Sequence, residues 1–124
     1  MTAKEKIQRI LEAAESKKAY DFTLLDLREM FPLADYWVVM SAPSVIQTKA
    51  IAEAVQTKMK AENLLPHHRE GLESGEWILL DYGDILVHIF RQEEREFYQL
   101  EKIWRKAAIL YLQRENIDRL DQIG

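Results

Sequence analysis

The 124-residue sequence has no cysteine, few glycines and prolines, and no apolar run that approaches ~20 residues. The absence of cysteine excludes disulfides, thiolate catalysis, iron–sulfur clusters and cysteine zinc sites. The short apolar runs argue against a membrane span, and 48% hydrophobic with 31% charged residues is typical of a soluble globular protein. The length predicts one domain with its own core.

The N-terminal residues lack the apolar core of a signal peptide, so we expect a cytoplasmic protein. The net charge of −4 argues against broad electrostatic capture of nucleic acid, because such capture needs clustered Lys and Arg. A basic protein is therefore the favoured partner. The basic residues Arg91, Arg95, Lys102, Arg105 and Lys106 are expected to form a solvated helix face.

Hydrophobic periodicity and turn residues predict the element order α-β-β-α-β-β-β-α. This order indicates a single α/β (α+β) domain, a mixed sheet of about five strands flanked by helices. The expected elements are a helix at 3–18, strands at 20–28 and 36–40, a helix from a Ser44–Gln47 capping box to about 62, a short strand at 64–69, a hairpin within 76–90, and a helix from about 93.

The hairpin has two apolar runs on either side of the turn-forming segment Asp81-Tyr82-Gly83-Asp84. Both faces of the two strands are apolar, which predicts that helices cover them on both sides. In the following helix, Phe97, Leu100 and Trp104 share a face expected to be core, while Tyr98 and Glu101 reach outward.

The apolar residues near the C-terminus predict a helical tail at 107–124, separate from a main domain at 1–106. Such a tail can pack on the domain or on a second subunit. A homodimer is therefore a hypothesis.

Three histidines and two aspartates are the candidate metal ligands, but no spacing joins three of them in one site. They are His67, His68, His88, Asp81 and Asp84. The favoured interpretation of His88 is a hydrogen-bonded residue of a buried strand. Neither a metal nor another cofactor is expected.

Nucleotidyl transfer is the most specific enzymatic hypothesis, since this reaction uses paired carboxylates that hold Mg²⁺ and a glycine-containing turn that holds phosphate. Asp81 and Asp84 lie three residues apart across a turn, and Pro43 stands where a glycine is wanted. We expect both aspartates to accept backbone hydrogen bonds around Gly83 instead, and no enzyme activity. A nucleotide-binding or nucleotidyltransferase-like enzyme and an RNA-binding module remain the alternatives.

Aromatic and acidic residues concentrate in one third of the chain. Such residues suit binding to a basic protein surface with scattered apolar residues, because a few aromatic anchors carry much of the affinity at protein interfaces. The candidate partner-binding residues are Trp77, Asp81, Tyr82, Asp84, His88, Tyr98, Glu101 and Trp104.

Several short motifs occur together between about Asp26 and Trp104. They are Ala34-Asp35-Tyr36, Arg69-Glu70-Gly71, Glu76-Trp77, Leu80-Asp81-Tyr82-Gly83-Asp84, Val87-His88 and Phe97-Tyr98-x-Leu100-Glu101-x-x-Trp104. Jointly they resemble the signature of the ribosomal silencing factor, or Iojap-like, family. The sequence departs from the usual family pattern at Ser41-Ala42, at Asn63 and at Lys106, and none of these belongs to the motifs.

The resemblance implies a nucleotidyltransferase-like domain that has lost its catalytic residues. It also implies binding to the large ribosomal subunit through a basic ribosomal protein of the L-fourteen family, on the face where the small subunit docks. Subunit joining would thereby be blocked, and translation repressed when nutrients are scarce. The eight candidate residues are placed by the resemblance at or just behind that surface.

Overall fold

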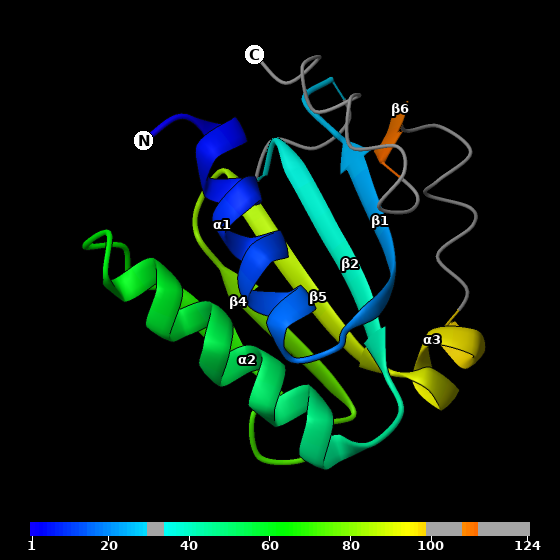
Figure 1. Cartoon of the computed structure of the whole chain (residues 1–124). Coiled ribbons are helices and arrows are strands. Elements are labelled where there is room, and N and C mark those ends of the chain that lie inside the picture. Colours follow the sequence, from blue (N-terminus) through cyan, green and yellow to red (C-terminus); the bar gives the residue numbers. More distant parts are fainter. Residues whose placement is uncertain (30–33, 99–107, 112–124) are drawn as a thin grey trace.

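The computed structural model describes residues 1–29, 34–98 and 108–111, and within them a mixed β-sheet carries two long helices on one face (Figure 1). The fold class expected from the sequence is confirmed, with six strands in place of about five. The elements are α1 (Ala3–Ser16), β1 (Tyr20–Asp26), β2 (Tyr36–Ala42), α2 (Val45–Lys60), β3 (His68–Glu70), β4 (Trp77–Asp81), β5 (Ile85–Arg91), α3 (Gln92–Tyr98) and β6 (Ala108–Tyr111).

The strands lie in the order β3-β4-β5-β2-β1-β6. The central pair, β2 and β5, is parallel, and every other pair is antiparallel. Parallel neighbours need a long crossover connection, which here contains α2, β3 and β4. The predicted hairpin is confirmed as β4 and β5, and Tyr82 N donates to Ile85 O at 2.9 Å across its turn.

Side-chain caps begin both long helices. Thr2 and Glu5 form a complete capping box at the start of α1, which was not predicted from the sequence. At α2 the Ser44 hydroxyl accepts from Gln47 N at 3.2 Å, as expected. The Gln47 side chain, however, donates to the carbonyl of Lys17 instead of returning to Ser44, so only half of the predicted box forms.

The end of α2 uses a residue in the left-handed conformation. Asn63 has φ of 60°, and the chain turns so that Leu64 N donates to Met59 O at 3.0 Å. Asparagine tolerates this conformation better than most residues, which explains why it can replace the glycine usual at helix ends.

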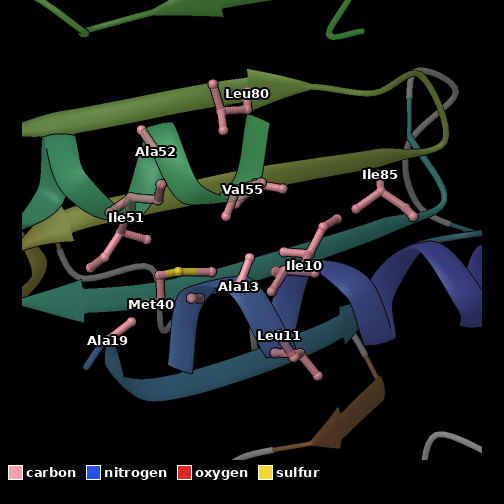
Figure 2. Close-up of a cluster of buried hydrophobic side chains, with 14 of the residues drawn as sticks. Ile10, Leu11, Ala13, Ala19, Met40, Ile51, Ala52, Val55, Leu80 and Ile85 are labelled. Carbon is pink, nitrogen blue, oxygen red and sulfur yellow. The ribbon is translucent and has the colours of Figure 1, made fainter. Parts of the chain in front are cut away.

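The core lies between the two long helices and the sheet. Figure 2 shows Ile10 and Leu11 of α1, Ile51 and Val55 of α2, and Met40 of β2 gathered in this layer. All five are buried, and burial of each such side chain stabilises the fold by about 1.5–3 kcal/mol. Helical spacing of apolar residues in the sequence is matched by buried stripes in both helices, and these are Ile7, Ile10, Leu11 and Ala14 in α1 and Thr48, Ile51, Ala52, Val55 and Met59 in α2.

Two expectations for the C-terminal part are wrong. Residues 108–111, predicted as helical tail, form strand β6 and pair with β1. Phe97, predicted as core, is 79% exposed. The remainder of the predicted tail, residues 112–124, and the segment 99–107 lie outside the described residues.

Helical cover is also less symmetric than predicted. Both long helices pack on one face of the sheet, and in the described ranges the opposite face carries the short helix α3 near one end (Figure 1). Within these ranges no helix has the length and apolar content needed to cross a membrane.

Candidate functional site

The face of the sheet away from α1 and α2 carries an aromatic cluster, composed of Trp37, Trp77, His88, Phe90 and Tyr98. Strand register explains why its sheet residues meet, because Trp77 of β4 pairs with Phe90 of β5, and residues two apart on a strand share a face. The Trp77 ring stacks on Phe90 with their ring centroids 4.8 Å apart, and its centroid lies 4.9 Å from that of Tyr98. The ring centroids of Trp37 in β2 and His88 are 4.4 Å apart. Three members, Trp77, His88 and Tyr98, were predicted from the sequence, whereas Trp37 and Phe90 were not.

His88 lies at the centre of this cluster and is 4% exposed. Its Nδ1 accepts a hydrogen bond from Trp77 Nε1 at 3.1 Å. An indole nitrogen only donates, so Nδ1 is unprotonated and the proton of the neutral ring is assigned to Nε2. Nε2 has no hydrogen-bond partner among the described residues.

Burial lowers the pKa of His88 to about 3, and the positive charge of Arg95 acts in the same direction. The ring is therefore neutral at neutral pH. The interpretation of His88 as a hydrogen-bonded strand residue is confirmed.

Arg95 of α3 reaches back across the end of the sheet. Its Nη1 donates to the Asp21 carbonyl at 2.7 Å and to Ser41 Oγ at 2.8 Å, and its Nη2 donates to Thr23 Oγ1 at 3.1 Å. Asp21 has φ of 53° where the β1–β2 register shifts. The expectation of a solvated Arg95 is therefore wrong, because this side chain fixes α3 to strands β1 and β2.

Helix α3 presents aromatic side chains to solvent. Its first residue, Gln92, accepts a hydrogen bond from the Tyr20 hydroxyl, which adds a second attachment to β1. Phe97 is 79% exposed and Tyr98 48%, and the Tyr98 ring rests against Trp77. Tyr98 thus reaches outward as predicted while one side of its ring is packed.

The turn between β4 and β5 holds the two candidate aspartates. Asp81 Oδ1 accepts from Gly83 N at 2.7 Å, which confirms the predicted turn role for this residue. The Asp84 carboxylate instead accepts from Lys6 Nζ of α1 at 3.2 Å and 3.3 Å, so the same prediction is wrong for its side chain. The two carboxylates therefore act in separate interactions and do not form a pair.

Tyr82 faces the helix-side core and is 5% exposed. Burial raises its pKa to about 12, so the phenol is protonated at neutral pH. Tyr82 lies with Asp81 and Asp84 at the end of the hairpin opposite Trp77. Asp81 lies four positions after Trp77 along β4, which corresponds to about 13 Å.

The structure therefore divides the predicted site into two groups, with Trp77, His88 and Tyr98 in one and Asp81, Tyr82 and Asp84 in the other. The remaining two candidates, Glu101 and Trp104, lie outside the described residues. In the described part of the chain, no group of three His, Cys, Asp or Glu side chains is arranged to hold a metal ion. In the first group the rings of Trp77 and Tyr98 are partly exposed over the buried His88, and partly exposed aromatic rings over a packed interior are typical of anchor residues at protein interfaces.

Comparison with known proteins identifies relatives over nearly the whole chain. A family model described as "Ribosomal silencing factor during starvation" matches residues 1–123. The ribosomal silencing factor RsfS of Halalkalibacterium halodurans is 31% identical over 113 residues, which cover 91% of this chain and 97% of that protein. The mouse "Mitochondrial assembly of ribosomal large subunit protein 1" is 26% identical over 105 residues, covering 82% of this chain and 46% of that protein.

A crystal structure of a Chromobacterium violaceum protein has the same fold, with a TM-score of 0.81 and 32% sequence identity. The match covers 94% of this chain and 98% of that one. The sequence motifs, the fold and the family match agree, and the chain belongs to the ribosomal silencing factor family.

Proposed function

We propose that this protein binds the large ribosomal subunit through a ribosomal protein of the L-fourteen family. By occupying the face where the small subunit docks, it prevents the subunits from joining and represses translation when nutrients are scarce. The observation that carries this proposal is membership of the ribosomal silencing factor family. The name of the mouse relative, which refers to assembly of the large ribosomal subunit, also supports the choice of subunit.

The binding surface in this proposal contains the exposed side of Tyr98, supported from behind by Trp77. His88 holds the Trp77 indole in place, and Tyr82 supports the turn that carries Asp81 and Asp84. The carboxylates of Asp81, Asp84 and Glu101 would face a basic partner, and Trp104 would add a further aromatic anchor. Removal of one tyrosine or tryptophan anchor at the centre of an interface typically costs about 2 kcal/mol or more of binding free energy.

The mechanism in this proposal is steric occlusion, so no covalent bond is made or broken and no cofactor is needed. Potency then depends on affinity and on residence time against the competing small subunit. The separate engagement of Asp81 by Gly83 and of Asp84 by Lys6 supports a non-enzymatic role. In this proposal the protein acts in the cytoplasm, where the ribosomes are. The hypothesis of a homodimer is a separate point, and light scattering of the purified protein tests it.

The direct test is sucrose-gradient sedimentation of purified large and small subunits at a Mg²⁺ concentration that permits joining. We expect the protein to travel with the large subunit and to reduce the peak of joined ribosomes. Protein that stays at the top of the gradient, with an unchanged joined peak, would contradict the proposal.

A matched pair of variants locates the surface. Tyr98→Ala removes a half-exposed ring of the aromatic cluster and should weaken large-subunit binding about thirtyfold, which corresponds to about 2 kcal/mol for an anchor residue. Ile46→Ala removes a 78% exposed side chain from α2, on the other face of the sheet, and should leave binding unchanged. An equal loss of large-subunit affinity in the two variants would contradict the proposed position of the binding surface.

A further inference from the structure

A second surface lies on the helix side of the molecule, at the edge of the sheet formed by β3. It is a groove of about 530 Å³ between α2 and the segment that leads to β3 and beyond. We call it the α2 groove, and the lining residues that matter here are Lys49, Glu53, Lys60, Leu65, Arg69 and Leu72. The aromatic cluster lies on the opposite face of the sheet, so both surfaces can be occupied at once.

The charge of the α2 groove is opposite to that of the whole protein. Lys49, Lys60 and Arg69 line it, with Glu53 as the acidic residue of its lining, in a chain whose net charge is −4. Within the described ranges none of the three cations makes an ion pair. Their charges are therefore available to a ligand.

Cations elsewhere on the helix layer behave differently. Lys58 Nζ lies 3.4 Å from a Glu12 carboxylate oxygen, and Arg9 Nε lies 3.4 Å from Glu62. Acidic residues thus form ion pairs with these neighbouring cations, whereas among the described residues Glu53 forms no ion pair with the three cations of the α2 groove.

Arg69 is held in position for recognition. It pairs with Leu80 across β3 and β4, which directs its side chain toward the helix side of the sheet. There Nη1 donates to Gln56 Oε1 at 3.1 Å. A neutral amide fixes the guanidinium without neutralising it, so the other N–H donors can bind a carboxylate in a fixed geometry.

Apolar side chains complete the α2 groove. Leu65 is 64% exposed, and the partly buried Leu72 also lines it, whereas none of the aromatic residues in the described ranges does. Single-stranded nucleic acid is usually held by cations together with aromatic rings on which bases stack, and the described lining of the groove contains no such ring. Cations beside leucines instead suit a helix that carries both acidic and apolar side chains.

We propose that the α2 groove binds an acidic amphipathic helix of a second protein partner, separately from the surface that contacts the ribosome. Lys49, Lys60 and Arg69 would bind the carboxylates of that helix, and Leu65 and Leu72 would contact its apolar stripe. Through this groove a ribosome-bound silencing factor recruits or is recruited by a further protein.

The test uses the full chain and a fluorescein-labelled peptide of about 15 residues, with leucines at helical spacing and glutamates between them. Fluorescence anisotropy should show saturable binding, weakened about tenfold by Lys49→Glu with Lys60→Glu. The matched control is Lys17→Glu with Lys58→Glu, which changes the net charge equally outside the α2 groove and should bind as the unmodified protein does. Each pair also removes one cation from the last turn of α2.

Three results would overturn the proposal: no saturable binding of the peptide, equal weakening by both double variants, or tight binding of an RNA oligonucleotide that competes with the peptide. Large-subunit sedimentation of the Lys49→Glu, Lys60→Glu variant separates this proposal from the proposed function. Normal sedimentation with lost peptide binding supports a distinct site, and loss of both contradicts it.

Discussion

Acidification should destabilise this protein through His88, over a pH range in which most carboxylates are still ionised. The pKa of His88 falls from an ordinary value of 6.5 to about 3 in the folded protein, with burial as the main cause. Because the unfolded chain binds this proton more tightly, the stabilising contribution is complete above about pH 6.5 and is lost progressively as the pH falls toward 3. Between pH 7.5 and pH 5.0 the free energy of unfolding should fall by about 2 kcal/mol, because the lower pH lies about 1.5 pH units below the ordinary pKa of histidine and each unit is worth about 1.4 kcal/mol.

The assay is urea unfolding of the unmodified protein and of His88→Asn at these two pH values. Asparagine keeps an acceptor near the position of Nδ1 for the Trp77 indole but does not titrate. The unmodified protein should lose about 2 kcal/mol more stability than His88→Asn between the two pH values. The absolute stability of the variant does not matter, since each protein is compared with itself. An equal pH dependence in both proteins would refute the assignment of a neutral, buried imidazole.

Four further substitutions test contacts of the aromatic cluster and of the turns beside β4. Arg95→Ala should lower the free energy of unfolding in urea by about 1–3 kcal/mol, because two buried hydroxyls lose a charged donor. It should also weaken large-subunit binding, because α3 is no longer attached to β1 and β2 through this side chain. Unchanged binding would show that this attachment of α3 is not needed. Trp77→Phe should keep the ring stacking but leave His88 Nδ1 unpaired, with a loss of about 1–3 kcal/mol by the same assay, and full stability would contradict the hydrogen bond. Gly71→Ala should lower the melting temperature more than Gly83→Ala. Both positions have positive φ, but an added Cβ at Gly71 would meet the backbone oxygen of Trp77 at 1.9 Å, whereas at Gly83 it would meet the end of the His67 side chain at 3.1 Å. Similar melting temperatures of the two variants would contradict that reasoning.

Local patterns in the sequence predicted the elements whose stability is decided locally. The stripe Ile51, Val55 and Met59 has helical period and is fully buried, and the turn at Gly83 was identified from its composition. Residues 108–111 were misassigned because a short apolar run has no period of its own, and its pairing with β1 depends on a strand about 85 residues earlier.

The site was predicted less completely because it depends on strand register. Trp77, His88 and Tyr98 were predicted together, but Trp37 and Phe90 join them only once β2, β5 and β4 are aligned. Alternation along each strand is the signal that would have found both residues after that alignment. Arg95 gave no such signal, since its acceptors include the carbonyl of Asp21, and a carbonyl is present at every residue.

The position of β6 at one end of the strand order has a consequence for synthesis of the chain. Strand β1 is made early, and its inner edge is paired by β2 soon afterwards. Its outer edge, however, is paired by residues 108–111, so this edge stays open until the ribosome has translated about 80 further residues after β1. An open edge can pair with other chains, which makes the interval before β6 docks the period of greatest aggregation risk for the nascent protein.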